Sequence, residues 1–230
     1  MATAKQELDR LLQDGPMRDI LIADEARAIV KAVDAGKVAI ARTSFEPVFR
    51  SLRAYAIEEI ILAVTRLFER SGRQYPLRSL PAAIDLFESH AATLTLAEPS
   101  LLRTPLEVLR LWSPGIERMA EPERVHRLAD MLRTCMPQTM SHPALDSLKT
   151  IRDKALAHHE NVAAASIPRT TWEPIDEMIR YAKCAVAAIA GGYLSIGYMM
   201  DDGSVPLTDD AGMAGYSVER LIAHLAAATI

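Results

Sequence analysis

The residues with the clearest capacity for chemistry lie in one decapeptide, residues 151–160, Ile-Arg-Asp-Lys-Ala-Leu-Ala-His-His-Glu. It places a permanently charged guanidinium, Arg152, one to two helical turns before two imidazoles, His158 and His159. A fixed cation can hold a phosphate, and a group that titrates near neutral pH can move a proton. This combination is a minimal set for chemistry at a phosphodiester without a metal ion.

The two histidines are not equivalent on a regular helix. At about 100° per residue, His159 lies nearly on the face of Arg152, whereas His158 is displaced by roughly 120°. A straight helix therefore favours His159 as the partner of Arg152, while a fraying helix end allows either imidazole to approach.

Charged neighbours of Arg152 permit both functional and structural interpretations. Asp153 either orients Arg152 or a histidine, or is an ordinary solvated charge. Lys149 and Lys154 either contact phosphates or are ordinary exposed lysines of a helix. The structural alternative for Arg152 is an ion pair with a nearby acid, namely Asp146, Asp153 or Glu160.

Composition limits the class of protein. The chain has 230 residues, is 50% hydrophobic and has only 5% aromatic residues, with alanine and leucine dominant, which favours helix packing over sheet. The net charge of −4 excludes a global positive field, so any RNA contact requires a local patch. No His-Glu-x-x-His or Cys-x-x-Cys motif occurs, so we expect neither a metal nor a cofactor.

Two cysteines without a disulfide pattern and a polar N-terminus without signal-peptide character favour a cytoplasmic protein. The uncharged segment 184–200 is shorter than the ~20 apolar residues of a membrane span and is rich in Ala and Gly. We therefore expect it to form a buried core helix, with Gly191 and Gly192 at a close helix crossing.

Hydrophobic periodicity predicts an all-α, up-and-down helical bundle, because no segment alternates as a strand does. Residues 1–40 form an N-terminal helical extension of two short helices broken at 14–16, residues 41–200 form the bundle, and residues 201–230 form a linker and a C-terminal helix. Further predicted helices cover 47–70, 78–91, 104–112, 122–134, 143–158, 171–200 and 218–228, with a loop at 135–142.

A helical bundle with Arg-Asp-Lys-Ala-Leu-Ala-His at the end of a long helix resembles the HEPN superfamily. Within it, residues 60–69 (IILAVTRLFE) and 75–80 (YPLRSL) resemble the AbiU-like branch of abortive-infection proteins. That branch usually has Asp where this chain has Glu69, a change that keeps the charge. The resemblance covers about residues 42–200.

The resemblance implies a homodimer that brings two Arg/His pairs into one cleft and cleaves RNA without a metal, in phage defence or toxin–antitoxin biology. It favours Arg152 and His158 as the catalytic pair, with Asp153, His159 and Arg66 as supporting or alternative residues and Lys149 and Lys154 as RNA contacts. An antitoxin protein is a further expected partner, and no membrane is expected. Arg66 and Glu69 are also explained by an intramolecular ion pair beneath the site.

Other members of the superfamily have lost catalysis. The alternative interpretation of this chain is therefore a non-catalytic, dimeric helical module that binds RNA or another protein, in which Arg152 and Asp153 only link helices. The two hypotheses differ in whether Arg152 and His158 line one solvent-open cleft.

Overall fold

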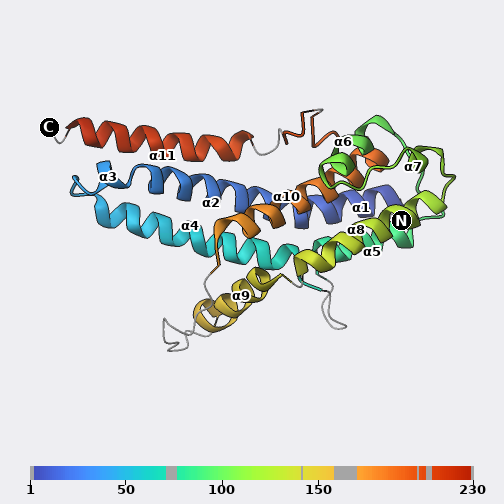
Figure 1. The fold of residues 1–230 in the computed structure, drawn as a ribbon, viewed down its shortest axis with the longest axis horizontal. Helices are drawn as coiled ribbons and strands as arrows, with labels where there is room; N and C mark the ends of the chain where they lie inside the picture. Colours follow the sequence, from blue (N-terminus) through green and yellow to red (C-terminus); the bar gives the residue numbers. More distant parts are fainter. Residues whose placement is uncertain are drawn as a thin grey trace.

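The chain folds as an all-α bundle, seen in a computed structural model that describes residues 3–70, 77–140, 142–157, 170–200, 202–205 and 209–228 (Figure 1). No strand occurs in these ranges, as the periodicity predicts. The helices are α1 (Ala4–Leu12), η1 (Gln13–Met17), α2 (Arg18–Ala35), α3 (Lys37–Ile40), α4 (Glu46–Leu67), α5 (Leu80–Ser89), α6 (Ser100–Val108), α7 (Pro114–Arg118), α8 (Glu123–Met140), α9 (Pro143–Ile151), η2 (Arg152–Ala157), α10 (Trp172–Ile189), η4 (Ala190–Leu194) and α11 (Asp209–Ala228).

Three long helices set the axis of the molecule. α2 lies between α4 and α11, and α10 crosses α2 and α4 while packing against α6 (Figure 1). α5 and α8 pair near the N-terminus, and α9 with η2 packs against the end of α4 and extends away from the bundle axis. One large apolar core takes side chains from α1, α2, α4, α5, α6, α8, α9 and α10.

The N-terminal helices run on without the predicted break at residues 14–16. The i→i+5 hydrogen bonds of η1 widen the turn there, so that Pro16, which lacks an N–H, lies inside a continuous helical rod. Gly15 is required by packing, because a Cβ at this position would lie 2.2 Å from the carbonyl oxygen of Arg78. The prediction of two separate short helices was therefore wrong.

Prolines also misled the prediction of the middle region. Helix α6 begins at Ser100, so Thr104 is not its N-cap and Pro105 lies buried inside the helix. The backbone of α8 continues to Met140 through the predicted loop at 135–142. In α6, burial of Leu102, Pro105 and Leu106 outweighs the local cost of the proline.

The predicted close crossing at the two glycines is confirmed. A Cβ on Gly191 would lie 3.0 Å from the Cβ of Leu101, and one on Gly192 would lie 3.3 Å from a methyl group of Leu96. The helical region nevertheless ends at Leu194, before the predicted end at residue 200, because Ser195 adopts a left-handed conformation (φ = 60°). At the other end of the sequence, α11 begins nine residues earlier than the predicted residue 218.

Tyr193 lies in the core, fully buried and in edge-to-face contact with Phe87 at 4.8 Å between ring centroids. Its hydroxyl lies 3.4 Å from Glu121 rather than facing a cleft. Across the described ranges, no helix has the length and apolar character needed to cross a membrane.

Candidate functional site

The position of Arg152 is set by the packing of α9. Pro143 occupies the first turn of this helix, and the His142 Nδ1 accepts a hydrogen bond from the backbone N–H of Ala144 at 3.1 Å. Buried apolar residues of α9, including Leu145 and Leu148, then hold it against α4. The chain enters η2 at Arg152, which therefore lies beside the C-terminal end of α4.

Arg152 donates to two carboxylates. Its Nε donates to the Asp153 Oδ1 at 2.7 Å and its Nη1 donates to the Glu69 Oε2 at 3.1 Å. The Arg152 side chain is 21% exposed, so the guanidinium is only partly shielded from solvent. The hydrogen bond to Asp153, together with the charge of Glu69, raises the pKa of Arg152, and its positive charge is therefore permanent.

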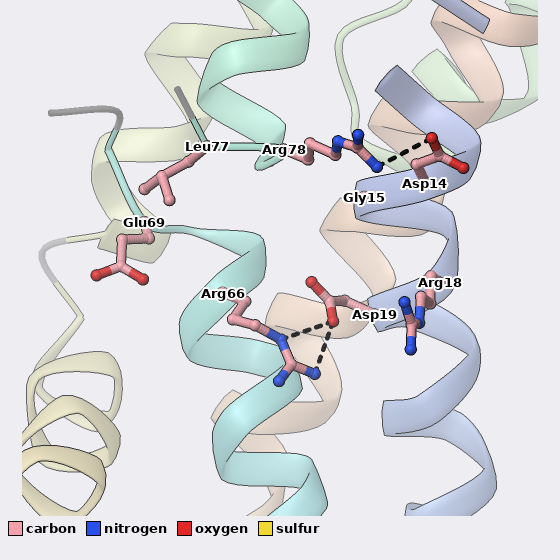
Figure 2. A pocket seen from close by; sticks show the side chains of 8 residues that line it. All are labelled: Asp14, Gly15, Arg18, Asp19, Arg66, Glu69, Leu77 and Arg78. Atoms are coloured by element: carbon pink, nitrogen blue, oxygen red, sulfur yellow. Dashed lines mark hydrogen bonds and ion pairs between the residues drawn. The ribbon is translucent and has the colours of Figure 1, made fainter. Parts of the chain in front are cut away.

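The second sequence motif contributes through two separate ion pairs. Arg66 pairs with Asp19 of α2, with its Nε 2.9 Å and its Nη2 2.8 Å from the Asp19 Oδ1 (Figure 2). Glu69, three residues later, turns instead toward Arg152. The predicted ion pairing at this motif is present, but each residue binds a different partner.

Asp19 is a buried carboxylate, with a relative exposure of 7%. Burial raises its pKa, and the hydrogen bond and charge of Arg66 oppose that rise. An unpaired carboxylate at this depth would be costly, so Arg66 is held in place by the need to neutralise Asp19.

These side chains line a pocket of about 300 Å³ between η1, the start of α2 and the end of α4 (Figure 2). Its lining contains three arginines and three acids, whose formal charges balance, together with Gly15 and Leu77. Across its mouth, Arg78 donates to Asp14 at 2.9 Å. Glu69 belongs to this lining and also binds Arg152, so the pocket adjoins the candidate catalytic arginine.

Sequence reasoning assigned no role to four charged members of this pocket, Asp14, Arg18, Asp19 and Arg78. Three of them form ion pairs: Asp19 with Arg66, and Asp14 with Arg78. Their partners lie 47 and 64 residues away in the sequence, and no local spacing marks such pairs. The one available signal was the acid at position 19 on a helix whose other residues at that face are apolar, because such an acid requires a cationic partner.

The structure describes only some of the remaining predicted site residues. Lys149 is half-buried and Lys154 is exposed, and neither makes an ion pair within the described part of the chain. His158 and His159 lie outside the described residues, as does Glu160, so their predicted roles stay predictions. The i→i+5 bonding of η2 makes each turn wider than in an α-helix, and the angular separation expected for a straight helix does not hold after Arg152.

Among the residues that the structure describes, no group of three or more His, Cys, Asp or Glu side chains is arranged to hold a metal ion. The two cysteines are both thiols, Cys135 half-buried and Cys184 buried, and burial raises the pKa of Cys184 to about 11. Neither thiol is therefore poised as a nucleophile near neutral pH.

The described residues form an all-α bundle in which Arg152 and Asp153 begin η2 beside the end of α4. A family model for AbiU2, one of the HEPN families, matches residues 26–213, and the chain belongs to that family. The match extends beyond residues 42–200 at both ends, into α2 and into α11. No curated protein and no solved structure matches the chain.

Proposed function

We propose that the protein is a metal-independent endoribonuclease that acts in phage defence or as a toxin, with Arg152 and His158 as its catalytic pair. Membership of a HEPN family and the placement of Arg152 beside the end of α4 support this proposal. The observation that carries it is the permanently charged guanidinium of Arg152, partly exposed and hydrogen-bonded to two carboxylates.

In the proposed reaction the ribose 2′-oxygen attacks the adjacent phosphorus. His158 takes the 2′ proton, the P–O5′ bond breaks, and the leaving 5′ oxygen receives a proton from an imidazolium. The products are a 2′,3′-cyclic phosphate and a 5′-hydroxyl. Arg152 stabilises the additional negative charge on the phosphoryl oxygens, which a bidentate guanidinium does well.

Arg152 enters this reaction with its charge already neutralised by Asp153 and Glu69. A phosphate must therefore share the guanidinium or replace one carboxylate. Asp153 is 56% exposed and Glu69 is 38% exposed, so either carboxylate can return to water at modest cost. Homodimerisation, as the HEPN resemblance implies, would bring a second Arg152 and His158 to the same cleft.

The test is RNA cleavage by the purified protein in excess EDTA, with Arg152→Ala and His158→Ala assayed beside it. We expect cleavage to survive chelation and to disappear in both variants, leaving 5′-hydroxyl ends that a polynucleotide kinase can phosphorylate. Arg42→Ala and His224→Ala remove an exposed arginine and an exposed histidine elsewhere and should cleave as the parent does.

Cleavage that persists in both Arg152→Ala and His158→Ala would refute this assignment, as would complete dependence on added metal. His159→Ala assayed in the same series decides between the two histidines. The variant that loses cleavage identifies the imidazole that moves the proton.

A second candidate function is supported by the same contacts. Two carboxylates on one guanidinium are also what a purely structural arginine needs, because Arg152 joins η2 to the end of α4. In that case the protein is a non-catalytic module that binds RNA or another protein. Absence of cleavage, combined with a lower unfolding temperature of Arg152→Ala, would favour this candidate.

A further inference from the structure

A second hollow involves α2 residues different from those of the Arg66 pocket. It has a volume of about 470 Å³ and is bounded by α2, α10, the end of α6 and the turn at 203–205. None of its lining residues belongs to the pocket beside Arg152. We call it the α2–α10 groove.

The α2–α10 groove has an excess of positive charge. Its lining contains four cationic side chains and two acidic ones, a net charge of +2, in a protein whose overall net charge is −4. The cations come from two rows at helical spacing that face each other: Arg27 and Lys31 on α2, and Arg180 and Lys183 on α10.

Two of these cations are neutralised and fixed in place. Arg27 forms a fork with Asp176, from its Nε at 2.7 Å and its Nη2 at 3.0 Å, and its guanidinium lies 4.2 Å from the ring centroid of Trp172. Lys183 pairs with Asp24. Both cations are largely buried, with side-chain exposures of 12% and 20%. These pairs build the wall of the groove and hold α2 against α10.

The other two cations, Lys31 and Arg180, are exposed and make no ion pair within the described ranges. They supply the uncompensated charge of the groove. The same lining also contains apolar side chains, among them Val108, Ile179 and Met199. A ligand that suits this surface has two negative charges at one end and an apolar body.

We propose that the α2–α10 groove binds a small phosphate monoester with an apolar body. A monoester carries close to two negative charges at neutral pH, since its second pKa is about 6, and this matches the charge that Lys31 and Arg180 leave uncompensated. Phosphodiesters of an RNA backbone carry one charge each, so the groove distinguishes a monoester from the substrate of the proposed ribonuclease site. The groove therefore functions independently of Arg152.

Isothermal titration of the full-length protein with phenyl phosphate tests the proposal, with methyl phenyl phosphate as the singly charged diester and phenol as the uncharged body. We expect saturable binding of phenyl phosphate, and binding at least about tenfold weaker for the diester and for inorganic phosphate. Lys31→Ala and Arg180→Ala should each weaken phenyl phosphate by about tenfold or more, because each removes a charged hydrogen-bond donor.

Lys31 and Arg180 are exposed, so both variants should unfold at the parent temperature when no ligand is present. The matched control is the double variant Lys37→Ala/Arg42→Ala, which removes one exposed lysine and one exposed arginine outside the groove. It should bind phenyl phosphate as the parent does.

Three results would overturn the proposal. The first is no saturable binding of phenyl phosphate up to about 10 mM, which covers millimolar Kd values. The second is an equal loss of affinity in the control double variant, since the binding would then reflect overall charge. The third is equal affinity for phenyl phosphate and its methyl diester, since the groove would then not recognise a dianion.

Discussion

Glu69 is the residue whose carboxylate connects the Arg66 pocket to Arg152, and it acts on the proposed reaction only through that arginine. It holds Arg152 at the end of α4, but it also cancels charge that a phosphate would use. The first effect helps Arg152 to act on a phosphate and the second opposes it, so substitutions of Glu69 can separate the two effects.

We expect Glu69→Gln to lower KM for RNA about threefold with kcat nearly unchanged, because the amide keeps an acceptor for Arg152 while the competing charge is lost. Glu69→Ala should lower kcat, because Arg152 loses its anchor on α4. Steady-state cleavage of a short RNA in EDTA measures both constants.

Glu59→Gln removes an exposed carboxylate from the same helix and is the matched control, with parent kinetics expected. A Glu69→Gln variant with the kcat of Glu69→Ala would contradict the positioning role, because the conservative side chain would then have failed to rescue the alanine variant.

For individual residues, the sequence predicted contacts only between close neighbours in the chain. Arg152 and Asp153 are adjacent, and their hydrogen bond was among the alternatives considered from the sequence. The pairs of Arg66 with Asp19 and of Arg152 with Glu69 depend on how α2, α4 and α9 pack, which no spacing within one helix encodes. The roles of His158 and His159 remain predictions.

Among the elements, α11 depends on one close approach to α2. A Cβ on Gly215 would lie 3.0 Å from both the Cβ and the carbonyl oxygen of Ala28. The backbone oxygen cannot move aside without shifting α2, so a larger residue must push the two helices apart.

We therefore expect Gly215→Ala to lower the free energy of unfolding by about 1–3 kcal/mol, despite the better helix propensity of alanine. Urea unfolding followed by circular dichroism measures this difference. Gly212 lies in the same helix with no neighbouring atom within 4 Å, so Gly212→Ala should instead stabilise by up to about 1 kcal/mol. Equal effects of the two substitutions would show that α11 does not pack closely on α2.

Helix existence was predictable from periodicity, whereas helix ends were not. The sequence predicted a break at residues 14–16 and a helix start at residue 104, yet Pro16 and Pro105 both lie inside helical segments because buried neighbours hold the backbone there. Gly191 was interpreted correctly, since a glycine in an apolar helical stripe has a steric explanation when another helix crosses it.

In the whole molecule, the N-terminal segment contributes to the large core, whereas α11 contributes only to a small cluster. Leu8, Leu12 and Ile20 belong to the large core shared by most helices. Ile222 of α11 belongs instead to a small separate cluster with Val33 and Phe49. The two ends of the chain should therefore differ in how much they matter for folding.

We expect a fragment of residues 41–230 to lose its cooperative thermal transition, because removal of α1 and α2 opens the main core. A fragment of residues 1–208, which lacks α11, should keep a cooperative transition at a lower temperature. Calorimetry of both fragments tests this contrast. A cooperative transition in the 41–230 fragment would show that the first 40 residues are an independent extension, as the sequence suggested.

Helix α2 takes part in four features of the molecule, the Arg66 pocket at Asp19, the core at Val30, the α2–α10 groove at Arg27 and the contact with α11 at Ala28. The consequence is evolutionary. Most helices at a protein surface have a solvent face on which neutral substitutions accumulate, but these four positions of α2 each meet a different partner. We expect these positions of α2 to drift slowly among related sequences, and their changes to occur together with changes at the partner positions, such as 66, 176 and 215.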